Sequence, residues 1–169
     1  MDPSRNVVLV GMPAVGKSTV GVLLAKRLGF SFVDTDIVIQ ALEGRTLQEI
    51  LDAEGAARFR ELEERRVLEL SLRRHVIATG GSVVYSEAAM RRLSASGIVI
   101  HLDLDLESLS ARLSDIGSRG VVMEPGETLS VLLERRRPLY LRHASVTLDC
   151  AGLSPERTVE RLLEILASA

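Results

Sequence analysis

The residues with the clearest chemistry lie near the start of the chain, where the sequence GMPAVGKS spans residues 11–18. Its pattern of Gly, four residues, Gly, Lys and Ser is that of a phosphate-binding loop. The two glycines let backbone N–H groups face one anion, Lys17 brings a positive charge to the β and γ phosphates, and Ser18 can ligate Mg²⁺. The sequence therefore predicts a site for a nucleoside triphosphate and magnesium.

This loop alone leaves a kinase, a GTPase and an ATPase open, because unrelated activities share it. A guanine-specific switch protein is expected to carry an Asn-Lys-x-Asp segment, and the sequence contains none. A motor or transport ATPase usually needs further domains. A glycine turn that caps a helix beside an incidental lysine is the purely structural alternative.

Two acidic residues, Asp34 and Asp36, follow the second apolar run of the chain. One carboxylate at this spacing can hold water on Mg²⁺ while the other accepts a proton from an attacking hydroxyl. Asp is also favoured in the first turn of a helix, so an acidic helix start explains the pair equally well.

Charged residues further along are ambiguous in the same way. Arg60 and Glu63 are three apart on a predicted helix and share a face, but so do many solvated surface pairs. The Gly80-Gly81 pair permits close approach to a ligand or makes a plain turn. Arg119 lies in an irregular stretch and is a candidate for delivery over a nucleotide by a closing lid, and Arg136 has no assignment on its own.

The elements that must position these residues alternate between strand and helix. Short apolar runs predict strands at residues 6–10, 31–33, 75–78, 98–102 and 146–148. Helices are predicted from near Lys17 to Gly29, from Asp36 to about residue 51, and at residues 55–73, 87–96, 106–113, 128–141 and 155–166. This order predicts an α/β fold in which a five-stranded parallel sheet has helices on both faces, within one domain spanning residues 1–169.

Composition excludes several classes of protein. The chain has 169 residues, 46% apolar, with 21 Lys and Arg against 23 Asp and Glu, and this balance gives no field for nucleic acid or an anionic membrane. Aromatic residues make up only 3%, too few for the stacking platforms of single-strand binders. No signal peptide or apolar run of membrane-spanning length is present, so a cytoplasmic protein is expected. The single cysteine, Cys150, favours neither a disulfide nor a zinc site.

Taken together, the motifs resemble those of the shikimate kinase family over about four-fifths of the chain. The family carries a phosphate loop, Asp-x-Asp, Phe-Arg-x-x-Glu, a glycine triplet, a lid arginine and Arg-x-Pro-Leu-Tyr, in that order. Here they stand as residues 11–19, 34–36, 59–63, 80–82, Arg119 and 136–140. The resemblance implies a phosphate-loop kinase architecture like that of nucleoside monophosphate kinases, with a mobile lid at about residues 114–127.

The resemblance also implies roles for individual residues. Catalytic roles fall to Lys17, Asp36 and Arg119. Nucleotide binding falls to Gly11, Ala14, Val15, Gly16, Lys17, Ser18, Thr19, Arg112 and Arg119, with Arg112 packed on adenine. Substrate binding falls to Asp36, Arg60, Glu63, Gly80, Gly81, Ser82 and Arg136, with Arg60 and Arg136 on the shikimate carboxylate. Magnesium is expected to be bound by Ser18 directly and by Asp34 through water.

The activity that follows is transfer of the γ-phosphoryl of ATP to the 3-hydroxyl of shikimate, with Mg²⁺, by a monomer that binds neither nucleic acid nor membrane. A kinase of a gluconate- or homoserine-type acceptor is the first alternative, and a nucleotide-binding regulatory module is the second.

Two positions depart from the family pattern. Ser82 replaces the third glycine of the triplet, so it adds a hydroxyl close to the expected substrate ring. The lid, usually Arg-Pro-Leu-Leu, reads Arg-Gly-Val-Val from Arg119 onward. Both departures bear on which acceptor is used rather than on the type of reaction.

Overall fold

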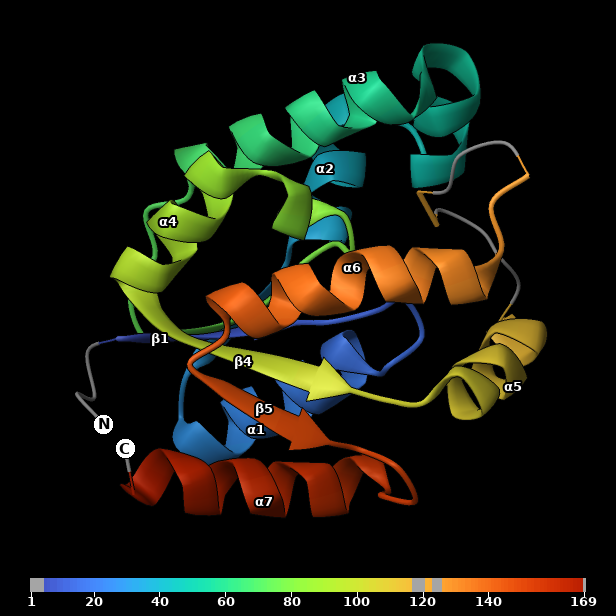
Figure 1. Cartoon of the computed structure of the whole chain (residues 1–169). Helices are drawn as coiled ribbons and strands as arrows, with labels where there is room; N and C mark the ends of the chain where they lie inside the picture. Colours follow the sequence, from blue (N-terminus) through green and yellow to red (C-terminus); the bar gives the residue numbers. More distant parts are fainter. Residues whose placement is uncertain (1–4, 117–120, 123–125, 169) are drawn as a thin grey trace.

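The computed structural model describes residues 5–116, 121–122 and 126–168. Within them, five strands form one sheet in the order β2-β3-β1-β4-β5, and every neighbouring pair is parallel (Figure 1). The strands are β1 (Asn6–Val10), β2 (Ser31–Asp34), β3 (His75–Ala78), β4 (Gly97–Asp103) and β5 (Val146–Asp149). The predicted five-stranded parallel sheet is therefore confirmed.

Helices cover both faces of this sheet. They are α1 (Lys17–Leu28), α2 (Thr35–Glu43), α3 (Leu47–Glu69), α4 (Glu87–Ser96), α5 (Leu106–Ile116), α6 (Leu129–His143) and α7 (Pro155–Ser168), with a short 3₁₀ helix, η1 (Val83–Tyr85). Figure 1 shows α1 and α7 on one face and α4 and α6 on the other. The central strand β1 is buried along its whole length, which is why residues 7–10 form an uninterrupted apolar run after Asn6.

The helix predictions were wrong at several boundaries. The stretch predicted as one helix up to about residue 51 is divided, because α2 ends at Gly44 in the left-handed region (φ 64°) and Thr46 starts α3 with a capping box. The helix predicted at residues 55–73 begins earlier and ends at Glu69, with a kink at Gly55 (φ 78°, ψ 169°). Helix α5 reaches Ile116, so the irregular stretch does not begin at Ser114 as predicted.

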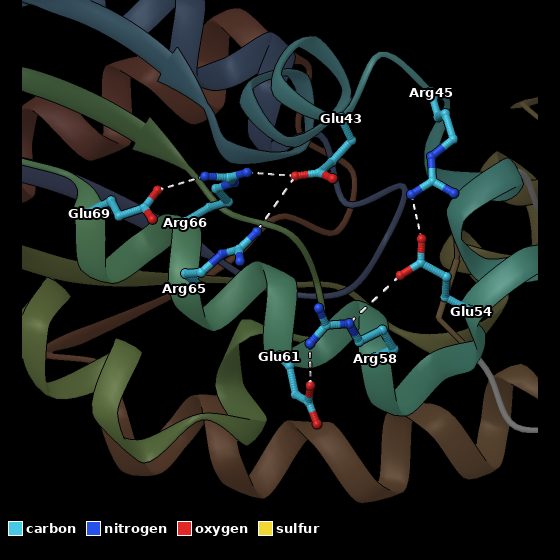
Figure 2. Close-up of polar contacts among 8 residues, drawn as sticks. All are labelled: Glu43, Arg45, Glu54, Arg58, Glu61, Arg65, Arg66 and Glu69. Carbon is cyan, nitrogen blue, oxygen red and sulfur yellow. Dashed lines mark hydrogen bonds and ion pairs between the residues drawn. The ribbon is translucent and has the colours of Figure 1, made fainter.

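Ion pairs on the outer surface attach α3 to α2 and to the turn between them. Figure 2 shows Arg66 donating to Glu43 across the two helices at 2.6 Å, and Glu54 pairing with both Arg45 and Arg58 beside the kink. Partly exposed pairs of this kind each contribute little, but several together fix the relative placement of two helices.

A small apolar cluster, separate from the main core, also joins α2 and α3. Its buried members are Ile39 of α2, Ile50, Phe59 and Leu62 of α3, and Val122. This cluster holds α2 and α3 in register with the segment that contains Val122. Among the described residues, no helix has the length and apolarity required to cross a membrane.

Replacement of Ile39 by Ala is expected to lower the free energy of unfolding by about 3 kcal/mol, because it leaves a cavity in the small cluster. Ile37 is on the same helix but is 60% exposed, whereas Ile39 is fully buried. Ile37→Ala is therefore the matched control and should change the free energy of unfolding by less than about 0.5 kcal/mol. Urea unfolding of both variants measures this difference, and equal losses would show that the cluster does not stabilise α2.

Candidate active site

The carboxyl ends of β1, β2 and β3 meet at one cavity of about 290 Å³. The phosphate-binding loop follows β1, Asp34 ends β2, and Gly80 lies just after β3. Ligand sites in open parallel sheets form at this edge because the loops after neighbouring strands converge there. Among the residues that line the cavity are Lys17, Asp36, Glu63, Gly81, Ser82 and Arg136.

Lys17 lies inside the phosphate-binding loop and is buried. Its Nζ donates to the carbonyl oxygens of Gly11 and Met12 at 2.8 Å each. Burial lowers the pKa of Lys17 to about 8, although the carboxylates of Asp36 and Asp34 act in the opposite direction. An anion bound in the loop would favour the charged ammonium again, so the lysine is suited to phosphate.

The two acidic residues after β2 have different roles in the structure. Asp34 caps α2, because its Oδ1 accepts from the backbone N–H of Asp36 at 2.9 Å, and its Oδ2 accepts from the Ser18 hydroxyl at 2.5 Å. The helix-start interpretation therefore holds for Asp34. Asp36 lines the cavity, and burial, followed by repulsion from Asp34, raises its pKa to about 6.

Glu63 of α3 is buried against Gly80 and Ser82. Its Oε2 accepts a hydrogen bond of 2.5 Å from Ser82, and its Oε1 has no hydrogen-bond partner within the described part of the chain. A Cβ on Gly80 would lie 2.1 Å from Glu63 Oε1 and 2.7 Å from Asp36 Oδ1, so the two carboxyl groups converge there and only glycine fits. Burial, followed by the charge of Asp36, raises the pKa of Glu63 to about 8.

Arg136 of α6 is almost completely buried and lines the same cavity. Its Nη2 donates to the Val122 carbonyl at 2.6 Å and its Nε donates to the Tyr85 hydroxyl at 3.3 Å. Its Nη1, which lies beside Gly81, has no hydrogen-bond partner among the residues described. A buried guanidinium nitrogen without a partner is costly in the free protein, which suggests that a ligand supplies the missing acceptor.

Arg60 and Arg136 both lie beside the ring of Tyr85. Their guanidinium carbons lie 5.1 and 5.3 Å from the centre of its ring. The two arginines thus share one region, although Arg60 is not among the residues that line the cavity. Sequence reasoning missed Tyr85, which could have been noticed as one of only two tyrosines in the chain.

The predicted adenine residue, Arg112, lies on the other side of the phosphate-binding loop. Its Nη1 donates to the Val15 carbonyl at 2.9 Å. A second cavity of about 290 Å³ is lined there by Arg112, Gly16, Thr158 and the buried Cys150. Burial raises the pKa of the Cys150 thiol to about 11, which makes it an unreactive part of the packing.

Most of the remaining predicted residues line the first cavity, and one lies outside the described part of the chain. Ala14, Gly16, Ser18 and Thr19 line the first cavity. Arg119 lies outside the described residues. Of the lid predicted at residues 114–127, Val121 and Val122 line the cavity. Across the part of the chain described, no group of three or more His, Cys, Asp or Glu side chains could hold a metal.

Taken together, this arrangement is that of a small phosphate-loop kinase, in which a triphosphate loop and a pocket for a second ligand share one edge of the sheet. The sequence profile described as Shikimate kinase matches residues 13–167. The chain therefore belongs to the shikimate kinase family.

Individual relatives agree with this assignment. A shikimate kinase of Thermodesulfovibrio yellowstonii is 39% identical over 95% of this chain and 94% of its own, and one of Thermosynechococcus vestitus is 41% identical over 95% and 89%. The solved structure of an Acinetobacter baumannii shikimate kinase in complex with shikimate superposes with a TM-score of 0.90, at 32% identity, over 98% of this chain and 94% of that one.

Replacement of Glu63 by Gln is expected to stabilise the protein at alkaline pH. The pKa of Glu63 is raised from 4.5 to about 8 in the folded state, so its contribution to stability is lost as the pH rises from about 4.5 to about 8. The neutral amide avoids that loss. The difference in free energy of unfolding between the variant and the wild type should therefore grow between pH 5 and pH 9, by on the order of 3 kcal/mol.

Urea unfolding at several pH values measures this difference. The neighbouring Glu64 is the matched control, because its carboxylate accepts from the Ser86 hydroxyl away from the cavity. Glu64→Gln measures what the loss of a carboxylate outside the cavity does to stability. A pH-independent difference for Glu63→Gln would show that the Glu63 carboxyl is not penalised by burial.

Proposed function

We propose that this chain is an ATP-dependent shikimate kinase, which transfers the γ-phosphoryl of ATP to the 3-hydroxyl of shikimate and releases shikimate 3-phosphate and ADP. One observation carries the choice of acceptor. The cavity beside Lys17 contains a buried donor, Arg136 Nη1, and a buried carboxyl oxygen, Glu63 Oε1, that both lack hydrogen-bond partners in the described region.

A ligand with both a carboxylate and hydroxyl groups satisfies these two atoms at once. The carboxylate accepts from Arg136, and a hydroxyl exchanges a hydrogen bond with Glu63. An apolar or purely cationic ligand would leave the guanidinium buried without a partner, which is strongly unfavourable. Shikimate carries one carboxylate and three hydroxyls on a small ring, and the A. baumannii relative is described in complex with it.

The residues around the cavity divide the work of phosphoryl transfer. Asp36, whose pKa is raised to about 6, is ionised at neutral pH and basic enough to accept the proton of the attacking hydroxyl. Lys17 offsets negative charge on the transferred phosphoryl group. Val121 and Val122 are apolar lining residues, and they help to exclude water that would compete as the acceptor.

The donor set fits Mg²⁺ held mainly by phosphates and water. Ser18 Oγ and Asp34 Oδ2 are hydrogen-bonded to each other at 2.5 Å, so two oxygen ligands are already adjacent at the loop. Ser18 would bind the ion directly and Asp34 through water. Bound Mg²⁺ would neutralise phosphate charge during transfer.

ATP is expected to span both cavities, with its phosphates at Lys17 and its base near Arg112. Arg119 is proposed to reach the phosphates from a mobile lid, and Arg60 to add a second guanidinium to the substrate carboxylate. A cytoplasmic location, a monomeric state and no binding to nucleic acid remain predictions from the sequence.

Coupled detection of ADP tests the assignment directly. ADP release should depend on shikimate and should not occur with gluconate or homoserine in its place. No response to shikimate, together with turnover of another hydroxy acid from this panel, would refute the proposed acceptor while leaving the kinase class intact.

Arg136→Lys is expected to raise the KM for shikimate at least about tenfold, a loss of about 1.4 kcal/mol, while the KM for ATP changes less than about twofold. The Nε of Arg136 serves Tyr85, its Nη2 serves the Val122 carbonyl and its Nη1 is left for a carboxylate, and the single nitrogen of a lysine cannot reach these three separate positions. Arg137→Lys is the matched control, because Arg137 is on the same helix but is half exposed and pairs with Asp103. Steady-state kinetics of both variants measure these KM values. If the two variants had the same KM for shikimate, the proposed role of Arg136 would be contradicted.

A further inference from the structure

Ser82 makes a buried hydrogen bond, although the backbone conformation at this position does not call for a serine. Its side chain is 2% exposed, and its Oγ donates to Glu63 Oε2 at 2.5 Å. The backbone of Ser82 is in the right-handed region (φ −94°, ψ −7°), so the residue does not need to be glycine or serine for conformational reasons.

The Ser82 hydroxyl does not cap the helix that follows it. Ser82 is the N-cap of η1, where a serine side chain commonly accepts from a backbone N–H of its own helix, yet it makes no such bond. It donates across the cavity wall to α3 instead. The bond therefore acts on Glu63 and not on the local turn.

Glu63 needs such a fixed partner because charged and titratable groups face it from three other helices. Lys17 of α1, Asp36 of α2, and Arg136 and Tyr140 of α6 all act on it electrostatically. Asp36 repels an ionised Glu63, while Lys17 and Arg136 attract it. Nevertheless, among the described residues Glu63 Oε2 accepts from Ser82 and Oε1 has no hydrogen-bond partner, so neither cation is hydrogen-bonded to this carboxyl.

We propose that Ser82 is a positioning residue for the acceptor substrate, whose hydroxyl holds the Glu63 carboxyl so that Oε1 faces the acceptor site instead of turning toward Arg136 or Lys17. The inference rests on the proposed function for the identity of the acceptor. Because Ser82 donates to Oε2, the proton of a neutral Glu63 is directed to Oε1, which then offers a donor to a substrate hydroxyl. Arg136 Nη1 is at the same time kept available for the substrate carboxylate.

Two readouts test this role with Ser82→Ala. The KM for shikimate should rise about tenfold while the KM for ATP changes less than twofold, because only the acceptor contacts Glu63. The pKa of Glu63, followed by carboxyl ¹³C NMR without any substrate, should rise, because a hydrogen bond that favours the ionised form is lost. A change in neither quantity would overturn the proposal, even if the variant were less stable.

The chain offers a closely matched control in Ser86. Its hydroxyl donates to Glu64 at 2.5 Å, one residue along α3 from Glu63, and it also caps α4. Ser86→Ala removes the same kind of bond between the same parts of the fold, but outside the cavity. It should lower the unfolding temperature at least as much as Ser82→Ala and leave both KM values unchanged. A rise in the shikimate KM of Ser86→Ala that matches that of Ser82→Ala would overturn the proposal.

A double-mutant cycle shows whether Ser82 acts through Glu63. In a Glu63→Gln background, Ser82→Ala should change the shikimate KM by less than about twofold. Additive effects would instead give Ser82 a separate role and refute the inference. If the wild type fails to use shikimate, the proposed function fails, and the NMR titration still decides whether Ser82 controls the Glu63 carboxyl.

Discussion

The structure depends on burying opposite charges around one cavity without letting them neutralise each other. Lys17, Asp36, Glu63 and Arg136 all line the same space at the carboxyl edge of the sheet. Buried charges normally pair, because an unpaired one loses its hydration without compensation. Here Lys17, Glu63 and Arg136 each have part of their hydrogen-bonding capacity satisfied by the protein, and Glu63 Oε1 and Arg136 Nη1 have no partner among the described residues. That residual capacity is what a ligand can use.

The scaffold keeps these groups apart by placing each on a different helix. Helix α1 carries Lys17, α2 carries Asp36, α3 carries Glu63 and α6 carries Arg136. Uncharged contacts hold these helices and the neighbouring turn in place. The Tyr140 hydroxyl donates to the Gly81 carbonyl at 2.5 Å and fixes the turn after β3, and the small apolar cluster under α2 and α3 fixes the spacing of the two carboxyl groups. The surface ion pairs of Figure 2 reinforce the same two helices from outside.

Sequence patterns predicted the parts of this arrangement that depend on local chemistry. All five strands were found because each is a short apolar run, and the phosphate-binding loop because its glycines and Lys17 have fixed spacing. The start of α3 was misplaced because the sequence prediction began a helix at Gly55, which is a kink inside α3, and missed the true break at Gly44. Asp36 and the turn at Gly80 lie together because the carboxyl ends of the neighbouring parallel strands β2 and β3 meet at one edge of the sheet. The bond from Ser82 to Glu63 joins residues 19 apart and depends on how α3 packs, so the sequence left its effect open.

The two carboxyl groups of the cavity differ in a way that sets its net charge. Asp36 has a pKa of about 6 and Glu63 one of about 8, since Glu63 is more deeply buried and faces the charge of Asp36. At neutral pH Asp36 is therefore mostly ionised while Glu63 is mostly neutral, so one serves as a base and the other as a hydrogen-bond donor. With Lys17 and Arg136 both positive, the four side chains then sum to a positive charge. Had both carboxyl groups been ionised, the sum would be zero and the cavity would no longer favour an anionic acceptor beside a triphosphate.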